Sequence, residues 1–446
     1  MFNRHHTAIA CLRALGLRAL AERSRKICRQ CGGCAAALSI VGVALLSFAA
    51  PARAQTFSQV VVFGDSNVDS GYYKALSNPG GNSTYNGLWA SAVADGAGAP
   101  TTSPGLGNAQ ILANFFGLTA NPANTAGGTN YATSGAKNVT VNNSQTGGFT
   151  AAIPTVTQIS NYLSANSGAA DGQALYFIHS GDNDAKYAAG ETGNGPYPSE
   201  PESYMIEAAD QLATAIQSLK SAGARHFLVS GLEYDYPLTD AKLRALKSLY
   251  TQILWTKLTA LRVPFIKADA DLVRLAISAN KSYYGFSAIG NTGSGPACTQ
   301  PNGITSAWAL LCSSNTSAPS VWTAPESETH LFADDQHLGT GGQQLMANYF
   351  YYLIVRHPNV TLTASPTTGQ GPLAVTLSAS GLPPPMTYSV FFDDGTTGSL
   401  TQTVCSGTNG IQCSGSTSHT YQAGAYNAVV VNASGVPLGA AKITVR

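Results

Sequence analysis

The sequence predicts an α/β fold built on a parallel sheet, followed by a small antiparallel β-sandwich. Two observations lead to this prediction. Residues 55–358 alternate short, strongly apolar segments with longer segments whose apolar residues recur every three or four positions. Residues 359–446 lack the helical spacing and consist of short β-branched runs separated by Gly, Pro and Asp turns.

Three segments in the first part have the pattern of buried parallel strands, and three have the pattern of helices that cover such a sheet. The strands are expected at residues 59–63, 174–178 and 227–230. The helices are expected at residues 202–222, 243–261 and 341–355.

Four segments in the second part predict strands, at residues 360–364, 374–378, 387–392 and 428–431. Their alternation and the turns between them favour an antiparallel sandwich of about immunoglobulin size. We therefore expect a domain boundary near residue 359.

The composition excludes several classes of protein. Charged residues make up only 11% of the 446-residue chain, against a typical value of about 25%. A nucleic-acid-binding protein needs a basic surface, and a coiled coil needs charges beside its seam. The chain instead has the composition of a loop-rich, secreted globular protein.

Residues 1–54 predict an export signal. They hold eight of the 24 Lys and Arg residues and one of the 23 acids, followed by an apolar run at residues 35–50 and a small-x-small cleavage site at residues 52–54. A membrane anchor is the alternative, but the run is shorter than the ~20 residues that a span requires. We expect a secreted or periplasmic protein that keeps no stable membrane span after cleavage.

The cysteines fall into two groups. Four lie in the predicted signal, where a metal site at residues 28–34 is the alternative reading but would be removed on export. The other four allow three disulfide connectivities. The simplest is Cys298–Cys312 with Cys405–Cys413, because each pair closes a short loop.

Two segments carry candidate catalytic residues. Ser66 follows the first predicted strand within Gly-Asp-Ser-Asn, a turn that can place a hydroxyl at the carboxyl edge of a parallel sheet. Asp334 stands three residues before His337, so that one loop can supply a base and the carboxylate that orients it. The alternatives are an ordinary turn and a helix-capping loop.

Two further segments can donate hydrogen bonds to an oxyanion. Residues 127–136 form a tight glycine-rich loop whose backbone N–H can face an oxyanion, and residues 181–184 (Gly-Asp-Asn-Asp) follow the second strand directly. Either can also be a simple turn. Asp182, Asp184 and Asp335 suggest a cation site as an alternative, although acids beside such a site are equally well turn residues.

These four segments, in this order, resemble the GDSL lipase/esterase family, also called SGNH hydrolases, over residues 57–356. The resemblance implies a three-layer α/β/α sandwich, Ser66 as nucleophile, and Asp334 and His337 as its triad partners. It also implies an oxyanion hole made by the Ser66 and Gly135 backbone N–H groups and the Asn183 side chain. No metal or cofactor is implied.

Finer features point to a branch of that family. The segment Asn86 to Trp89 (Asn-Gly-Leu-Trp), with Asp69 and Gly71, is similar to lecithinase-like members. Asn67 stands where the family name GDSL has Leu. Because this position is outside the triad, the difference affects the expected substrate preference more than the expected chemistry. Asp335 stands where Gly is frequent, and its charge should raise the pKa of His337.

The C-terminal segment resembles PKD or other immunoglobulin-like modules, on residues 364–369, 393–395 and 419–426. The whole chain is expected to be a secreted serine esterase or lipase acting on a lipid, a short acyl ester or an acylated polymer. An acetyl esterase, an acyltransferase and a non-catalytic binding protein are the alternatives; the last would be favoured by a missing Ser or His, and both are present. Nucleic acid is not an expected partner.

Overall fold

The computed structural model describes residues 56–80, 83–139, 151–191, 197–232, 240–301, 308–323, 326–384, 387–406 and 412–446. Residues 56–446 form one compact unit. The predicted export signal lies outside the described residues, so the prediction for residues 1–54 stays untested. Among the helices that the structure describes, none combines the length and apolarity needed to cross a membrane.

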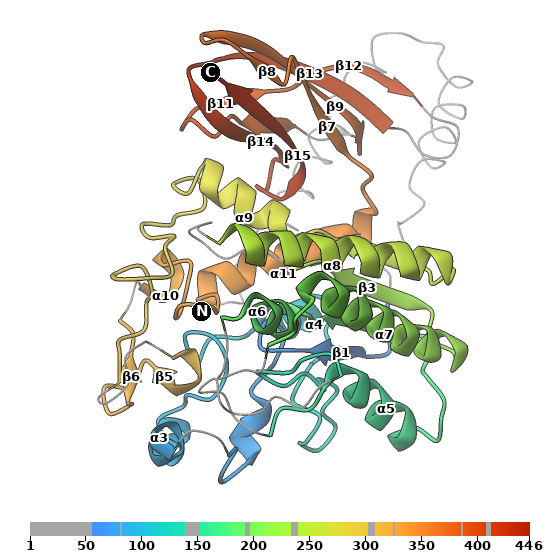
Figure 1. The fold of residues 1–446 in the computed structure, drawn as a ribbon, viewed down its shortest axis with the longest axis vertical. Helices are drawn as coiled ribbons and strands as arrows, with labels where there is room; N and C mark the ends of the chain where they lie inside the picture. Colours follow the sequence, from blue (N-terminus) through green and yellow to red (C-terminus); the bar gives the residue numbers. More distant parts are fainter. Residues whose placement is uncertain are drawn as a thin grey trace, which may run out of the picture. The chain divides into compact units, whose positions relative to one another are not determined.

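A four-stranded, fully parallel sheet lies at the centre of the first part of the chain (Figure 1). Its order is β1 (Val60–Gly64), β2 (Leu175–His179), β3 (His226–Ser230) and β4 (Phe265–Ala268). All residues of β1 and β2 are buried, which explains their continuous apolar sequence. The three predicted strands are confirmed to within one residue at each end.

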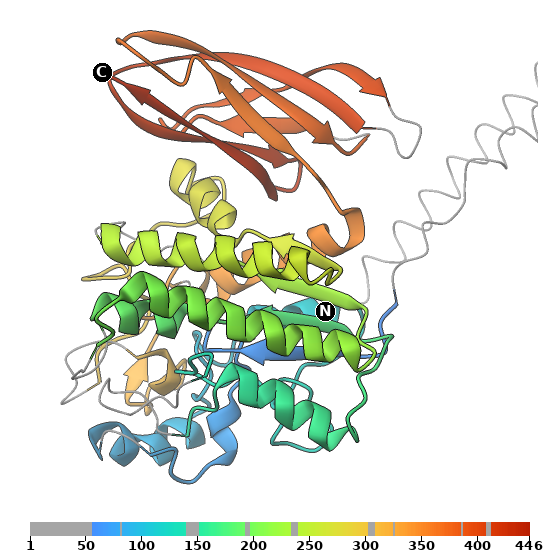
Figure 2. The same ribbon diagram turned by 45° about the vertical axis from the view of Figure 1, so that its right-hand side comes forward.

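Helices cover both faces of the sheet, as the alternation predicted. Alternate strand residues such as Val61 and Tyr176 pack against one group of helices, and Val60 and Phe177 pack against the other. The first group is α5 (Thr155–Ala165), α6 (Asp182–Ala189), α7 (Pro201–Ser221) and α8 (Ala241–Ala260). The second is α4 (Asn108–Phe115), α9 (Ala270–Ala279) and α11 (Thr340–Arg356). The result is a three-layer arrangement, and Figure 2 shows α7 and α8 side by side on one face.

Shorter elements connect these layers. They are η1 (Tyr72–Ala75), α3 (Ser83–Ala94), η3 (Ala309–Leu311), β5 (Cys312–Ser313), β6 (Ser320–Val321) and α10 (Glu326–Thr329). The disulfide Cys298–Cys312 closes this region and confirms the first predicted pair.

The C-terminal strands form two sheets that share an apolar core. One has the order β11-β10-β14-β15-β8 and the other β12-β13-β9-β7. The strands are β7 (Thr361–Ser365), β8 (Thr368–Gly369), β9 (Leu373–Leu382), β10 (Tyr388–Phe391), β11 (Thr397–Ser399), β12 (Thr401–Ser406), β13 (Gln412–Tyr421), β14 (Gly424–Asn432) and β15 (Pro437–Val445). Alternate residues such as Val375, Val390 and Ile443 supply the shared core. The disulfide Cys405–Cys413 joins opposite residues of β12 and β13, which confirms the second predicted pair.

The end of β1 can be occupied only by glycine. Gly64 has a φ of +151°, and a Cβ added to it would lie 1.8 Å from the carbonyl oxygen of His179 on β2. The Gln158 side chain of α5 binds both its N–H and its carbonyl oxygen, at 2.9 and 2.8 Å. The two strands therefore approach closely at the edge where Ser66 and residues 181–184 follow them.

We expect Gly64→Ala to lower the free energy of unfolding by about 3 kcal/mol or more, because the new methyl group meets rigid backbone and the φ angle is strained. Urea or thermal unfolding measures this. Gly87→Ala is the matched control, since nothing lies within 4 Å of its added Cβ in α3. It should be neutral or stabilise the protein by up to about 1 kcal/mol. Equal stability of the two variants would contradict the close strand contact.

Candidate active site

Ser66 lies in a single helical turn directly after β1. The backbone N–H groups of Val68 and Asp69 donate to the carbonyl oxygen of Asp65, at 3.2 and 3.1 Å. The Asp65 carboxylate accepts the N–H of Asn67 at 3.1 Å. Ser66 itself is half-buried while Asp65 is completely buried. The turn thus holds the Ser66 side chain at the carboxyl edge of the sheet, where ligands bind in open α/β folds.

Two asparagine side chains hold the backbone of this turn from outside. Asn108, at the start of α4, donates to the carbonyl oxygen of Asn67 at 2.8 Å, and Asn130 donates to that of Val68 at 2.7 Å. Asn108 also donates to Gln343 of α11 at 2.7 Å. Because both amide hydrogens of Asn108 are used, the turn that carries Ser66 is tied to the helix that follows His337.

The carboxylate of Asp69 connects the same turn to the glycine-rich loop. One oxygen accepts the N–H and the hydroxyl of Ser134, at 2.9 and 2.6 Å, and the other accepts two backbone N–H groups at residues 71 and 72. Burial raises the pKa of Asp69, although these hydrogen bonds oppose the rise. Gly135 follows Ser134 with a left-handed φ of +83°, so the contact fixes the start of the backbone that carries its N–H.

Asn183 lies in the first turn of α6, which begins three residues after β2. Gly64 and His179 are paired across the parallel strands, so Ser66 and Asn183 emerge at the same edge of the sheet. The Asn183 amide nitrogen donates to the carbonyl oxygen of Ala136 at 3.0 Å. An amide has two hydrogens, so this bond orients the side chain while the amide keeps a second hydrogen that can be donated to another acceptor.

Asp334 and His337 form a buried pair in the loop before α11. The Nδ1 atom of His337 lies 2.8 Å from Asp334 Oδ2. The same carboxylate accepts the backbone N–H groups of Ala309, Gln336 and His337, at 2.7, 2.9 and 2.7 Å. With Nδ1–H donating to the carboxylate, the Nε2 atom of the neutral imidazole keeps its lone pair to accept a proton.

The charges of this loop shift the pKa of the imidazole. Burial lowers the pKa of His337, but the charge and hydrogen bond of Asp334 outweigh burial, and Asp335 adds to the rise. The pKa of His337 is therefore raised, in the direction expected from Asp335. Burial and the neighbouring Asp334 raise the pKa of Asp335 itself. Lys186 of α6 reaches this loop and donates to Gln336 at 2.8 Å.

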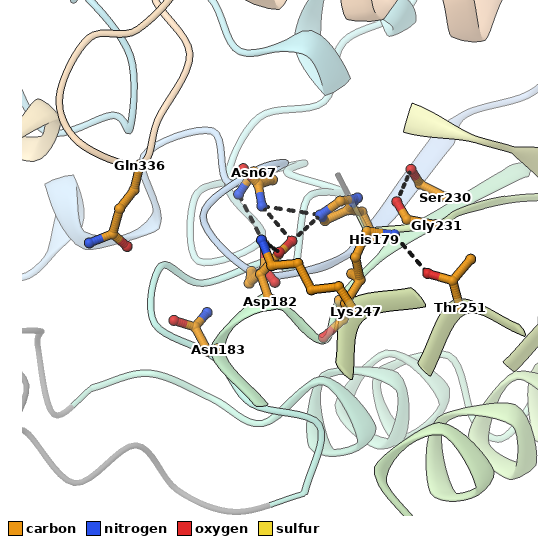
Figure 3. A network of polar contacts seen from close by, with 12 residues as sticks. Asn67, His179, Asp182, Asn183, Ser230, Gly231, Lys247, Thr251 and Gln336 are labelled. Carbon is orange, nitrogen blue, oxygen red and sulfur yellow. Dashed lines mark hydrogen bonds and ion pairs between the residues drawn. The ribbon is translucent and has the colours of Figure 1, made fainter. Parts of the chain in front are cut away.

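A second polar cluster lies beneath the turn and the start of α6, and Figure 3 shows its side chains pointing toward one another. Asp182 Oδ2 accepts a hydrogen bond from Asn67 Nδ2 at 2.9 Å and lies 2.9 Å from His179 Nε2. Asp182 Oδ1 forms an ion pair with Lys247 Nζ at 2.7 Å. Lys247 is not among the site residues predicted from the sequence, although a Lys four residues after Leu243 lies on the apolar stripe of a predicted helix.

The described residues contain one group with the geometry to hold a metal ion, Asp65, His179 and Asp182, whose ligand atoms lie within 4.8 Å of one another. The Lys247 ammonium is already bound to Asp182 and supplies positive charge at that point. Asp184 and Asp335, the other two acids that the sequence suggested for a cation site, are not part of this group. Asp184 accepts hydrogen bonds from Tyr204 and the Asn138 backbone, and Asp335 lies in the His337 loop.

The contacts connect all the predicted site segments. Asp69 connects the turn that carries Ser66 to the glycine-rich loop, and Asn108 connects that turn to α11. Asp182 connects it to the start of α6, and Lys186 connects α6 to the His337 loop. These contacts show which segments lie next to one another. The catalytic roles of the five predicted residues stay a prediction.

Comparison with known proteins gives one informative result. No curated protein sequence matches the chain. A search of solved structures returned the Pseudomonas fluorescens alkylpurine DNA glycosylase AlkC bound to DNA containing an abasic site analog, with 12% identity over 65% of this chain and 96% of that one. The TM-score of 0.16 does not indicate a shared fold. The profile of the family described as GDSL-like Lipase/Acylhydrolase matches residues 60–350. This match covers every segment of the candidate site, and the chain belongs to the GDSL-like lipase/acylhydrolase family.

Proposed function

We propose that this protein is a secreted serine esterase or lipase that hydrolyses carboxylic esters through a Ser66–His337–Asp334 triad. Family membership supports ester hydrolysis. The observation that carries the specific proposal is the buried Asp334 carboxylate on Nδ1 of His337. This is the arrangement that a general base requires. The loop of these two residues leads into α11, which Asn108 links to the turn that bears Ser66.

The first half-reaction forms an acyl-enzyme. His337 Nε2 takes the proton of the Ser66 hydroxyl as its oxygen attacks the ester carbonyl carbon. Asp334 stabilises the imidazolium that results. Collapse of the tetrahedral intermediate breaks the bond to the alkoxy oxygen, which leaves with the proton from His337.

The oxyanion of that intermediate is held by three proposed donors: the backbone N–H groups of Ser66 and Gly135 and the Asn183 side chain. Loss of one such donor typically raises the barrier by about 3–4 kcal/mol. The bond from Asn183 to the Ala136 carbonyl supports this role, because it orients the amide before substrate arrives.

The second half-reaction releases the acid. His337 removes a proton from water, which attacks the acyl carbonyl carbon, and Ser66 leaves with that proton. An alcohol in place of water gives transfer of the acyl group, so the products distinguish a hydrolase from a transferase. Substrate preference within the ester class depends on pocket shape rather than on the triad.

Secretion and the C-terminal module belong to the same proposal. Two disulfides are typical of an oxidising compartment, and the pattern of residues 1–54 is that of an export signal. We assign residues 55–358 to the hydrolase domain and residues 359–446 to a PKD or immunoglobulin-like module. Its two sheets with a shared core support this assignment.

We expect the purified protein to hydrolyse at least one member of a p-nitrophenyl ester panel from acetate to palmitate. Ser66→Ala should reduce kcat at least about 10⁴-fold, because nucleophile and proton acceptor act as a unit. Ser70→Ala, a buried serine just after the same turn, is the control and should keep most of the activity. Activity that survives Ser66→Ala would refute the nucleophile. A folded wild-type protein that hydrolyses none of these esters would refute the proposal that it is an esterase acting on simple esters.

The pH profile tests His337 as the base. Its neutral form is required and Asp334 raises its pKa, so kcat/KM should fall as the pH drops through a midpoint above 6.5. Asp335→Asn removes a charge that raises this pKa, so the acid limb should move to lower pH. Asp210→Asn, in an exposed pair with Lys257, should leave the limb in place. An acid limb that Asp335→Asn does not move would contradict the assignment.

A further inference from the structure

Asn67 is the residue at which this chain departs from the family name, and its side chain has a specific partner. Its amide nitrogen donates to Asp182 Oδ2 at 2.9 Å and lies 3.1 Å from His179 Nε2 (Figure 3). A leucine at this position has no donor. Asn67 therefore makes a contact that the eponymous residue of the family cannot make.

The partner carboxylate is buried and held from two other sides. Lys247 Nζ lies 2.7 Å from Asp182 Oδ1 and is 1% exposed, and His179 Nε2 lies 2.9 Å from Oδ2 and is 2% exposed. Burial raises the pKa of Asp182, but Lys247 and His179 outweigh it and hold the pKa far below its ordinary value. Asp182 is thus an anion with a fixed orientation.

Asn67 and Asp182 are each adjacent in sequence to a proposed site residue. Asn67 follows the proposed nucleophile Ser66, and Asp182 precedes the proposed oxyanion donor Asn183. One hydrogen bond therefore joins the two halves of the site across the gap between β1 and β2. Lys247 anchors this bond to α8.

We propose that the Asn67–Asp182 hydrogen bond, anchored by Lys247, positions Asn183 relative to Ser66 in the transition state. Asn67 is a positioning residue, since it acts through Asn183 and the turn. This inference rests on the proposed triad and oxyanion hole. It predicts an effect on kcat rather than on KM, because oxyanion donors act on charge that develops only in the transition state.

The test is a double-mutant cycle of Asn67→Leu and Asn183→Ala, assayed on the best p-nitrophenyl ester. Asn67→Leu should lower kcat about 10- to 100-fold, because a shift of about 1 Å at a donor costs that much. Its KM should stay within about threefold and its Tm within a few degrees of the wild type. In the Asn183→Ala background, the same substitution should change kcat less than about threefold, because its target is gone.

Two controls and one replacement variant separate the outcomes. Asn114→Leu, an exposed position on α4, should leave kcat unchanged. Should Asn67→Leu not fold, Asn67→Ala replaces it in the cycle, since it only removes atoms from a half-buried side chain. Ser66→Ala reports on the proposed function itself: if it remains active, the triad fails and the inference fails with it.

Two results overturn the inference alone, with Ser66→Ala inactive. One is a kcat for the folded Asn67 variant within about twofold of the wild type. The other is an equal loss in both backgrounds, which would show that Asn67 acts independently of Asn183.

Discussion

Buried carboxylates that must find partners organise the whole site. Asp69, Asp182 and Asp334 lie away from water, and a charge left unpaired there costs about 3–5 kcal/mol. Each one satisfies this demand by binding groups from a second segment of the chain. Asp69 binds the glycine-rich loop, Asp182 binds Asn67 and α8, and Asp334 binds His337 and η3. The hydrogen bonds and ion pairs of these three carboxylates therefore set the positions of the loops around the candidate site.

The parallel sheet brings the segments that carry Asp69 and Asp182 to one edge. The pairing of Gly64 with His179 brings the ends of β1 and β2 to one edge, and only a glycine permits the close approach there. Everything that follows either strand within a few residues then lies at that edge. The loop with Asp334 and His337 comes from far along the chain, so it needs the separate contacts through Asn108 and Lys186.

Strong local patterns in the sequence were sufficient to predict β1, β2, β3, α7, α8 and α11, because continuous apolar runs and helical spacing depend on few neighbours. The pattern failed for β4, whose residues are mostly half-exposed, and for α6, whose acidic start has the composition of a turn. The predicted disulfides were correct because each closes a short loop. Lys247 was missed because its partner, Asp182, is distant in sequence, and only the fold brings a lysine on an apolar stripe to a carboxylate.

Most of the buried charged side chains of this weakly charged chain lie near the candidate site. Among the described residues, the buried charged side chains other than the histidines are Asp65, Asp69, Lys137, Asp182, Asp184, Lys186, Lys247, Arg274 and Asp334. All except Arg274, which pairs with Asp271, belong to the site segments or contact them. Since burial in a low dielectric strengthens each interaction, a few charges suffice to fix the geometry. In a chain that is only 11% charged, eight of these nine buried charges therefore lie in or against the candidate site.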